Sequence, residues 1–190
     1  MEKLTVGLAL CGSYCTYRKM MVVAEQLCKV YDIVPILSEN AASTDSRFGK
    51  AADFRAQLEA FSGRSVIDTI AAAEPFGPRK LLDALVIAPC TGNTIAKLAA
   101  GIADSSVTLA AKAHLRNNRP VIIAVSTNDG LSGNAANIGT LLNRKHYYFV
   151  PFSQDDPLEK PSSLVADFDR IADTVEAAMH GEQIQPLLLR

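Results

Sequence analysis

The sequence lacks the features that mark nucleic-acid-binding, membrane and exported proteins. Its 19 Lys and Arg residues nearly balance its 20 Asp and Glu residues, and no basic segment is dense enough to indicate binding to a nucleic-acid backbone. No apolar run reaches the roughly 18 residues that a membrane-spanning helix needs. The first residues also lack the basic and apolar regions of a signal peptide. We therefore expect a cytoplasmic protein with no membrane or nucleic-acid partner.

Motifs for metals and common nucleotides are also missing. The four cysteines form no Cys-x-x-Cys pair and have no metal-ligand spacing, so we interpret them as reduced thiols. The Gly-x-Gly-x-x-Gly motif of dinucleotide sites and the Gly-Lys-Ser/Thr motif of P-loops are absent. We predict no metal, and the sequence favours neither a dinucleotide nor a P-loop nucleotide.

The chain does alternate apolar runs with helical patterns, which is typical of an α/β domain. It has 190 residues, of which 48% are hydrophobic, and is long enough for one ample core. We predict a single domain over residues 1–190, a three-layer αβα sandwich around a Rossmann-like parallel sheet. The expected strands are 4–10, 33–37, 85–88, 121–125 and 146–150. The expected helices are 17–30, 51–61, 93–101, 104–117, 134–142 and one that starts at 163, with loops at 39–49 and 151–161.

The segment 85–104 is the most informative part of the chain. Its apolar start indicates a buried parallel strand that ends at Pro89, because proline cannot donate to a sheet ladder. A helix follows at once, with Asn93 as its expected cap. Between them Gly92 lets a ligand approach the backbone, and Thr91 and Asn93 offer polar groups beside the N–H donors of the helix start. The segment suits a planar, polar or anionic ligand, and an ordinary capped strand-to-helix turn explains it equally well.

Another polar turn follows the first predicted strand. Gly12 and Ser13 lie between that strand and a helix start, where backbone N–H groups and the helix dipole favour a phosphate. A tight turn that needs Gly12 for its backbone explains the same residues. Farther along, Arg47 lies in the predicted loop 39–49. Its guanidinium suits a carboxylate, and a solvated loop arginine is an equally good interpretation.

Both turns resemble those of a known family. Segment 89–97, Pro-Cys-Thr-Gly-Asn-Thr-Ile-Ala-Lys, and segment 101–104, Gly-Ile-Ala-Asp, are similar to the Pro-Ala-Ser-Ala-Asn-Thr signature of the FMN-binding cysteine-decarboxylase-type flavoproteins. Segment 12–19, Gly-Ser-Tyr-Cys-Thr-Tyr-Arg-Lys, is similar to the segment that holds the FMN phosphate in that family. The resemblance implies the homo-oligomeric flavoprotein fold of these decarboxylases and a bound FMN.

The resemblance also implies roles for individual residues. The residues expected to bind the cofactor are Gly12, Ser13, Ser38, Thr91, Gly92 and Asn93. The first three would hold the phosphate, with a simple cap or turn hydroxyl as the alternative for Ser38, and the last three would contact the ring or the ribityl chain. Asn93 and Asn128 are the expected catalytic residues. Asn128 and Arg47 are the expected substrate ligands, and no side chain stands out as a general base.

Departures from the family pattern concern the substrate. The decarboxylases carry a histidine that serves their chemistry in the region matching 62–89, and this chain has none there. Their Pro-x-Met-Asn element keeps its asparagine as Asn128, but Ser126 and Thr127 replace the proline and the methionine. This pattern predicts the same flavin with a different substrate.

Longer stretches point to a narrower family. They are 11–17, 47–49, 66–68, 73–75, 88–93, 110–113, 115–120, 125–129, 148–152 and 154–157. Together they resemble the B chains of the dipicolinate synthases of spore-forming bacteria. The resemblance implies synthesis of dipicolinate from a 4-hydroxy-tetrahydrodipicolinate in the mother cell of a sporulating bacterium, with FMN here and NAD(P) on a partner A chain.

Two alternatives stay open at this point. One is a flavoprotein decarboxylase or prenyltransferase, which the missing histidine disfavours. The other is a non-catalytic subunit that supports the A chain, since such a protein would keep the same glycines. A homo-oligomer is expected from the family, and the apolar tail within 181–190 is expected to pack on a neighbouring subunit.

Overall fold

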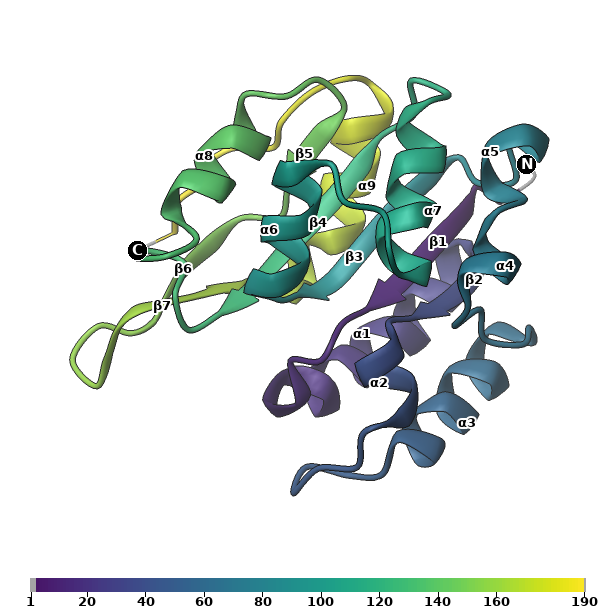
Figure 1. Ribbon diagram of the computed structural model, residues 1–190, viewed down its shortest axis with the longest axis horizontal. Coiled ribbons are helices and arrows are strands. Elements are labelled where there is room, and N and C mark those ends of the chain that lie inside the picture. The colour runs from purple at the N-terminus through teal and green to yellow at the C-terminus, as the bar shows by residue number, and fades with distance from the viewer. Residues whose placement is uncertain (1–2, 190) are drawn as a thin grey trace.

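The computed structural model describes residues 3–189 as a seven-stranded sheet between two layers of helices (Figure 1). The strand order is β2-β1-β3-β4-β7-β6, and β5 pairs with the first part of β4. The strands are β1 (Thr5–Leu10), β2 (Asp32–Leu37), β3 (Ala84–Cys90), β4 (Val121–Thr127), β5 (Tyr147–Phe149), β6 (Phe152–Asp156) and β7 (Lys160–Ala166). Strands β1 to β5 are parallel, whereas β7 is antiparallel to both β4 and β6. The predicted αβα fold class is confirmed.

Helices cover both faces of the sheet. On one face lie α1 (Tyr17–Val30), α3 (Ala51–Ser62) and α9 (Ile171–Met179), and on the other α6 (Gly92–Ala100), α7 (Ser106–Leu115) and α8 (Ala135–Leu142). In Figure 1, α6 and α7 lie in front of the central strands, and α1 and α9 lie behind them. The shorter helices are α2 (Glu39–Ser43), α4 (Ile70–Ala73), α5 (Phe76–Arg79) and the 3-10 turns Tyr14–Thr16 and Phe168–Arg170. No helix within 3–189 is long and apolar enough to cross a membrane.

The core follows from the apolar runs of the sequence. All seven residues of β3 are buried, because a central parallel strand is covered by helices on both faces. Helix α1 contributes Met20, Ala24 and Leu27 from one face, at the spacing of an amphipathic helix. The strands β1, β3 and β4 therefore form a rigid support, and their carboxyl ends meet at one edge of the sheet.

The predicted end of the central strand at Pro89 is wrong. Strand β3 continues to Cys90, and the Pro89 carbonyl accepts a hydrogen bond from the Cys11 N–H at 3.2 Å. Pairing of β3 with β4 shifts its register between Ile87 and Cys90, which accommodates the residue that has no N–H. Proline thus disrupts the ladder locally and does not end it.

The predicted cap of the following helix is also wrong. Thr91, not Asn93, caps α6, since its hydroxyl accepts a hydrogen bond from the Thr94 N–H at 3.4 Å. Threonine and asparagine are both good cap residues, but the cap must be the residue at which the backbone turns from strand to helix. Asn93 consequently lies in the first turn of α6.

The chain after Val150 differs most from the prediction. The expected loop 151–161 and the expected helix start at Ser163 are replaced by the hairpin of β6 and β7, which projects from the body in Figure 1. Charged residues and Pro161 interrupt the apolar pattern by which a strand is predicted from the sequence. Both features are usual in strands at a sheet edge. The last helix, α9, begins only at Ile171.

Two further segments carry more structure than expected. The predicted loop 39–49 contains α2, which Ser38 caps by accepting a hydrogen bond from the Ala41 N–H at 3.3 Å. The tail pairs with its own chain, because Leu189 N–H donates to the Phe152 carbonyl at 2.9 Å. Leu188 nevertheless keeps 68% of its surface exposed, so an apolar side chain of the tail remains accessible to a neighbour.

Candidate functional site

The predicted site residues come from turns at the carboxyl ends of four parallel strands. Gly12 and Ser13 follow β1, Ser38 follows β2, Thr91 follows β3, and Asn128 follows β4. Strands β1 and β3 are neighbours in the sheet, but the chain continues from β1 to β2 on one side and from β3 to β4 on the other. Ligands of open α/β sheets bind at such a switch point, outside the carboxyl ends of the strands. The fold therefore brings residues that are far apart in sequence to one edge.

Two adjoining cavities open at this edge. The large cavity has a volume of about 610 Å³ and includes Ser13, Arg47 and Asn128 in its lining. The small cavity has a volume of about 370 Å³ and includes Ser38 and Asn93. Both cavities are lined by Gly12 and Thr91, which stand at their junction. Every predicted site residue except Gly92 lines one of them, in a volume range that is usual for small-molecule sites.

The first turn is held by its own hydrogen bonds. The Tyr17 hydroxyl donates to the Cys11 carbonyl, and the Thr16 hydroxyl donates to the Ser13 carbonyl, each at 2.8 Å. A Cβ atom at Gly12 would lie 3.2 Å from the Tyr14 hydroxyl oxygen, so a side chain there would displace Tyr14. Glycine therefore packs closely against Tyr14 and leaves the backbone accessible.

A hydroxyl pair joins this turn to the end of β4. The side-chain oxygens of Ser13 and Ser126 are 2.8 Å apart, although 113 residues separate them in the sequence. Ser126 is one of the residues that replace the Pro-x-Met part of the decarboxylase element. The replacement thus supplies a hydroxyl partner for a predicted phosphate ligand, which the family resemblance did not reveal.

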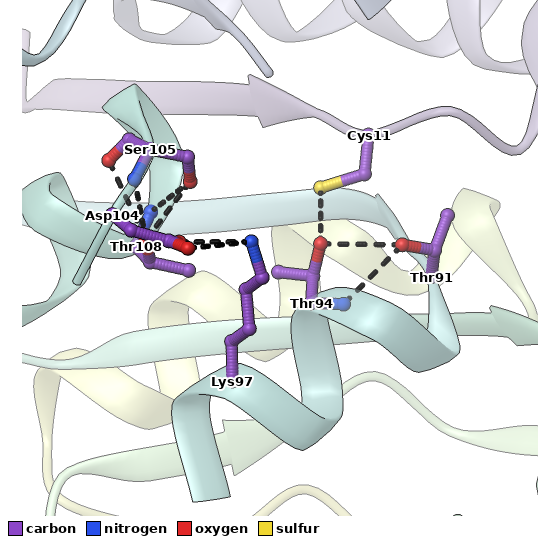
Figure 2. A network of polar contacts seen from close by, with 7 residues as sticks. All are labelled: Cys11, Thr91, Thr94, Lys97, Asp104, Ser105 and Thr108. Atoms are coloured by element: carbon purple, nitrogen blue, oxygen red, sulfur yellow. Dashed lines mark hydrogen bonds and ion pairs between the residues drawn. The ribbon is translucent and has the colours of Figure 1, made fainter. Parts of the chain in front are cut away.

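The start of α6 is tied to the end of β1 by a chain of hydroxyls and a thiol (Figure 2). The Thr91 and Thr94 hydroxyl oxygens are 3.2 Å apart, and the Thr94 hydroxyl donates to Cys11 Sγ at 3.2 Å. Burial raises the pKa of the Cys11 thiol to about 11, and the hydrogen bond from Thr94 opposes the shift only in part. Cys11 therefore stays protonated near neutral pH and is unsuited to be a nucleophile.

Gly92 has a packing role that the sequence did not indicate, and its contact with a cofactor stays a prediction. A Cβ atom there would lie 2.5 Å from Asn134 Nδ2, 2.6 Å from Thr127 Oγ1 and 2.7 Å from Asp129 Oδ1. These three side chains form a network in which Thr127 and Asn134 both donate to the Asp129 carboxylate, at 2.6 and 2.8 Å. Gly92 is buried and absent from the linings of both cavities, so it lets this network approach α6.

Two members of this network, Asp129 and Asn134, were not predicted from the sequence. The signal that could have found Asp129 is the turn-forming run Asn128-Asp129-Gly130 directly after a buried strand. Nothing in the local sequence connects Asn134 to it, because the network closes only when the end of β4 folds back onto the start of α6. The network fixes the position of the β4 turn that carries Asn128.

The small cavity is lined by neutral residues together with Glu39, Lys97 and Asp104, and its lysine is already paired. Lys97 donates to both oxygens of Asp104, at 2.8 and 3.0 Å, as Figure 2 shows. The ion pair lowers the pKa of the Asp104 carboxyl, mainly through the hydrogen bond from Lys97. Hydroxyl groups such as that of Ser38 and the N–H groups of the α6 start remain as the donors for an anion.

Two cations lie on the lining of the large cavity. The Arg47 guanidinium lies over the Phe48 ring, 4.8 Å from its centroid. Lys160, at the start of β7, donates to Asp155 Oδ2 at 2.7 Å, and this interaction raises the pKa of the lysine. Lys160 was missed from the sequence because the hairpin that carries it was expected to be a loop.

Histidines take no part in the site. His114, His146 and His180 are absent from the linings of both cavities. His114 is buried within α7, where desolvation and the nearby Arg119 lower its pKa to about 4. Within residues 3–189, no cluster of His, Cys, Asp and Glu side chains has the arrangement of a metal site.

The fold and the two cavities are those of an α/β protein that binds a small molecule at the carboxyl edge of its sheet. Comparison with known proteins identifies the family. The chain belongs to the flavoprotein family, whose model matches residues 1–180. It is 44% identical over 185 residues to the dipicolinate synthase B subunit of Bacillus subtilis (strain 168), covering 97% of this chain and 92% of that protein. The crystal structure of the B subunit of dipicolinate synthase from Bacillus halodurans is also similar, with a TM-score of 0.91 and 40% identity over 100% of this chain and 99% of that one.

More distant structures share the fold. The FMN-dependent cysteine decarboxylase SpaF superposes with a TM-score of 0.70 at 20% identity, covering 94% of this chain and 97% of that one. The resemblance seen in the sequence motifs is thereby confirmed at both levels, the broad flavoprotein family and the narrower group of dipicolinate synthase B subunits.

Proposed function

We propose that this chain is the B subunit of a dipicolinate synthase. In this role it binds FMN and acts with an A chain to convert a 4-hydroxy-tetrahydrodipicolinate to dipicolinate. The observation that carries the proposal is the pair of cavities shared by Gly12 and Thr91, which gathers the predicted ligands from four strand ends. The 44% identity to the B subunit of a dipicolinate synthase supports it. From the resemblance of the sequence to the B chains of spore-forming bacteria, we also propose a role in sporulation, in the mother cell.

The residues present fit FMN. Gly12 leaves the junction of the two cavities free of a side chain beyond the backbone, and the small cavity offers Ser38 with the α6 start for a phosphate. Ser13, its partner Ser126 and Thr91 supply hydroxyl groups along the large cavity. Bound FMN would supply a two-electron acceptor for the oxidation. Neutral donors at a strand-to-helix turn are a usual setting for a phosphate.

The substrate side of the proposal rests on charge. The substrate carries two carboxylates, and Arg47 and Lys160 both lie on the lining of the large cavity. We assign each of them one carboxylate, with the Lys160 ammonium leaving Asp155 when the substrate binds. Asn128, also on this lining, would orient the ring through its amide. Formation of dipicolinate requires loss of one water and of two hydrogen atoms from the ring.

We base the proposed partners and assembly on the same resemblance. We assign the A chain an NAD(P)-dependent oxidoreductase reaction and this chain a homo-oligomeric state, in which the exposed Leu188 of the tail contacts a neighbouring subunit. The absence of histidines from the cavity linings disfavours a cysteine decarboxylase. A supporting subunit without chemistry of its own is the remaining alternative.

An anaerobic reduction experiment separates these alternatives. The purified chain is loaded with FMN, and 4-hydroxy-tetrahydrodipicolinate is added with and without the A chain while the flavin absorbance is followed. Bleaching of the flavin in the FMN-loaded chain supports an oxidoreductase half-reaction here. Dipicolinate formation by the A chain without any change in the flavin spectrum would contradict the catalytic role and leave a supporting subunit.

A further inference from the structure

A pocket at the opposite end of α6 belongs to no part of the candidate site. It has a volume of about 390 Å³ and lies between the end of α6, residues 108–115 of α7 and the segment 144–147 at the start of β5. We call it the basic pocket. Thr91, at the start of α6, lines the candidate site, whereas Leu98 near the end of α6 lines the basic pocket. The two sites therefore share a helix but no lining residue.

The charge of this pocket is one-sided. Lys112, Arg144 and Lys145 line it, and no Asp or Glu is among its ten lining residues. None of these three cations belongs to an ion pair within the part of the chain that the structure describes. The whole chain has a formal charge of −1, so the excess of positive charge is local to this pocket. A concave surface with charge of one sign concentrates ions of the opposite sign.

The remaining walls are apolar. Leu98 and Tyr147 are almost completely buried and form the floor, while Ile102 is 47% exposed at the side. Burial of an apolar ligand body against these walls would add to the attraction of the cations. A hydrated inorganic ion would leave the same walls in contact with water.

The backbone beneath the pocket is fixed in an unusual way. Arg144 donates from Nη1 to the Leu98 carbonyl at 3.1 Å and from Nη2 to the Ala99 carbonyl at 2.7 Å, which ties the segment to the end of α6. His146 has φ of 69°, in the left-handed region that non-glycine residues seldom adopt. Such conformations concentrate at ligand sites, where the surrounding structure maintains them.

We propose that the basic pocket binds a small organic carboxylate with an apolar body. Lys112 and Lys145 would contact the carboxylate, since Arg144 is already engaged with the helix end. Leu98, Leu115 and Tyr147 would contact the ring or chain of the ligand. This binding does not depend on the proposed dipicolinate synthase function.

Calorimetric titration of the full chain with benzoate, in the presence of saturating FMN, tests the proposal. We expect saturable binding, with shifts of the Leu98 and Leu115 methyl signals in NMR spectra, and no binding of benzylamine, which has a similar shape and the opposite charge. The double variant Lys112→Gln/Lys145→Gln should weaken benzoate binding about tenfold or more. Lys29→Gln, in the last turn of α1, is the control that should leave it unchanged.

A second variant keeps the test independent of the lysines. Ile102→Glu places a carboxylate at the half-exposed side of the pocket, and it should weaken benzoate binding by a similar factor through repulsion. Absence of saturable benzoate binding would overturn the proposal. So would binding that survives both changes, or equal binding of benzylamine.

Discussion

The hydroxyl oxygens of Ser13 and Ser126 lie 2.8 Å apart and join the turn after β1 to the end of β4. The pair crosses the carboxyl edge of the sheet over the intervening strand β3. Ser13 is thus positioned by Ser126, a residue of the segment that matches the Pro-x-Met-Asn element of the related decarboxylases. The contact therefore fixes the turn after β1 relative to the end of β4, from which Asn128 follows.

Replacement of Gly92 by alanine should disrupt the network that underlies this edge. The new Cβ would press on Asn134, Thr127 and Asp129 at 2.5 to 2.7 Å, and we expect a loss of about 1–3 kcal/mol in the free energy of unfolding. The matched control is Gly139→Ala in α8, where no heavy atom outside its chain neighbours and the helix's own backbone lies within 4 Å of the added Cβ. It should be neutral or stabilising by up to about 1 kcal/mol. Urea unfolding measures both, and equal stabilities would contradict the packing role of Gly92.

Ser38 and Thr69 allow the phosphate role of Ser38 to be separated from capping. Both hydroxyls cap short helices, by accepting from the Ala41 N–H at 3.3 Å and from the Ala72 N–H at 3.2 Å. Each substitution to alanine should cost roughly 1 kcal/mol of stability. Only Ser38→Ala should weaken FMN binding, by about tenfold, with riboflavin binding unchanged because riboflavin has no phosphate. Similar FMN affinities of the two variants would leave Ser38 as a cap alone.

Arg47 and Lys160 should determine the preference for two carboxylates. In the FMN-loaded chain, Arg47→Gln and Lys160→Gln should each weaken dipicolinate binding about fivefold to tenfold. The affinity for picolinate, which has a single carboxylate, should fall less than the affinity for dipicolinate in at least one of the two variants. Lys50→Gln, beside the same loop but outside the cavity lining, controls for general loss of charge. If the double variant Arg47→Gln/Lys160→Gln still binds dipicolinate more tightly than picolinate, other groups hold the second carboxylate of the substrate.

The buried His114 should make the fold less stable in mild acid. Its pKa is lowered to about 4 by burial, from 6.5 for an exposed histidine. Between these values the unfolded chain binds more protons than the folded chain. The contribution of His114 to the free energy of unfolding is therefore complete above about pH 6.5 and is lost as the pH falls towards 4. It amounts to up to roughly 3 kcal/mol. Urea unfolding at several pH values should show a flatter acid dependence for His114→Gln, and identical slopes would contradict the assignment.

The sequence predicted the elements that rest on strong periodicity. The runs ending at Leu10, Leu37 and Val125 are apolar and largely buried, and the polar residues after them fall at the sheet edge as expected. The hairpin of β6 and β7 was missed because an exposed edge pair needs few apolar residues. Contacts that close only in the fold, such as Asp129 with Asn134, have no local signature.

The junction of β3 and α6 shows the same limit on a smaller scale. Proline at 89 and asparagine at 93 were interpreted by their intrinsic preferences, as strand end and helix cap. Tertiary structure overrides both, since the neighbouring strands β1 and β4 hold β3 in place past the proline. The cap then falls on Thr91, the first residue after the strand.

Binding of FMN at the junction of the two cavities can be measured by titrating the purified chain with FMN and following flavin fluorescence. We expect saturable binding that is weakened in Gly12→Val, because the new side chain would occupy this junction and crowd Tyr14 on the lining of the large cavity. Gly139→Val, where no heavy atom outside its chain neighbours and the helix's own backbone lies within 4 Å of the added Cβ and which is outside both cavities, controls for loss of a glycine elsewhere. Absence of FMN binding to the native chain, with and without the A chain, would contradict the proposed flavin site.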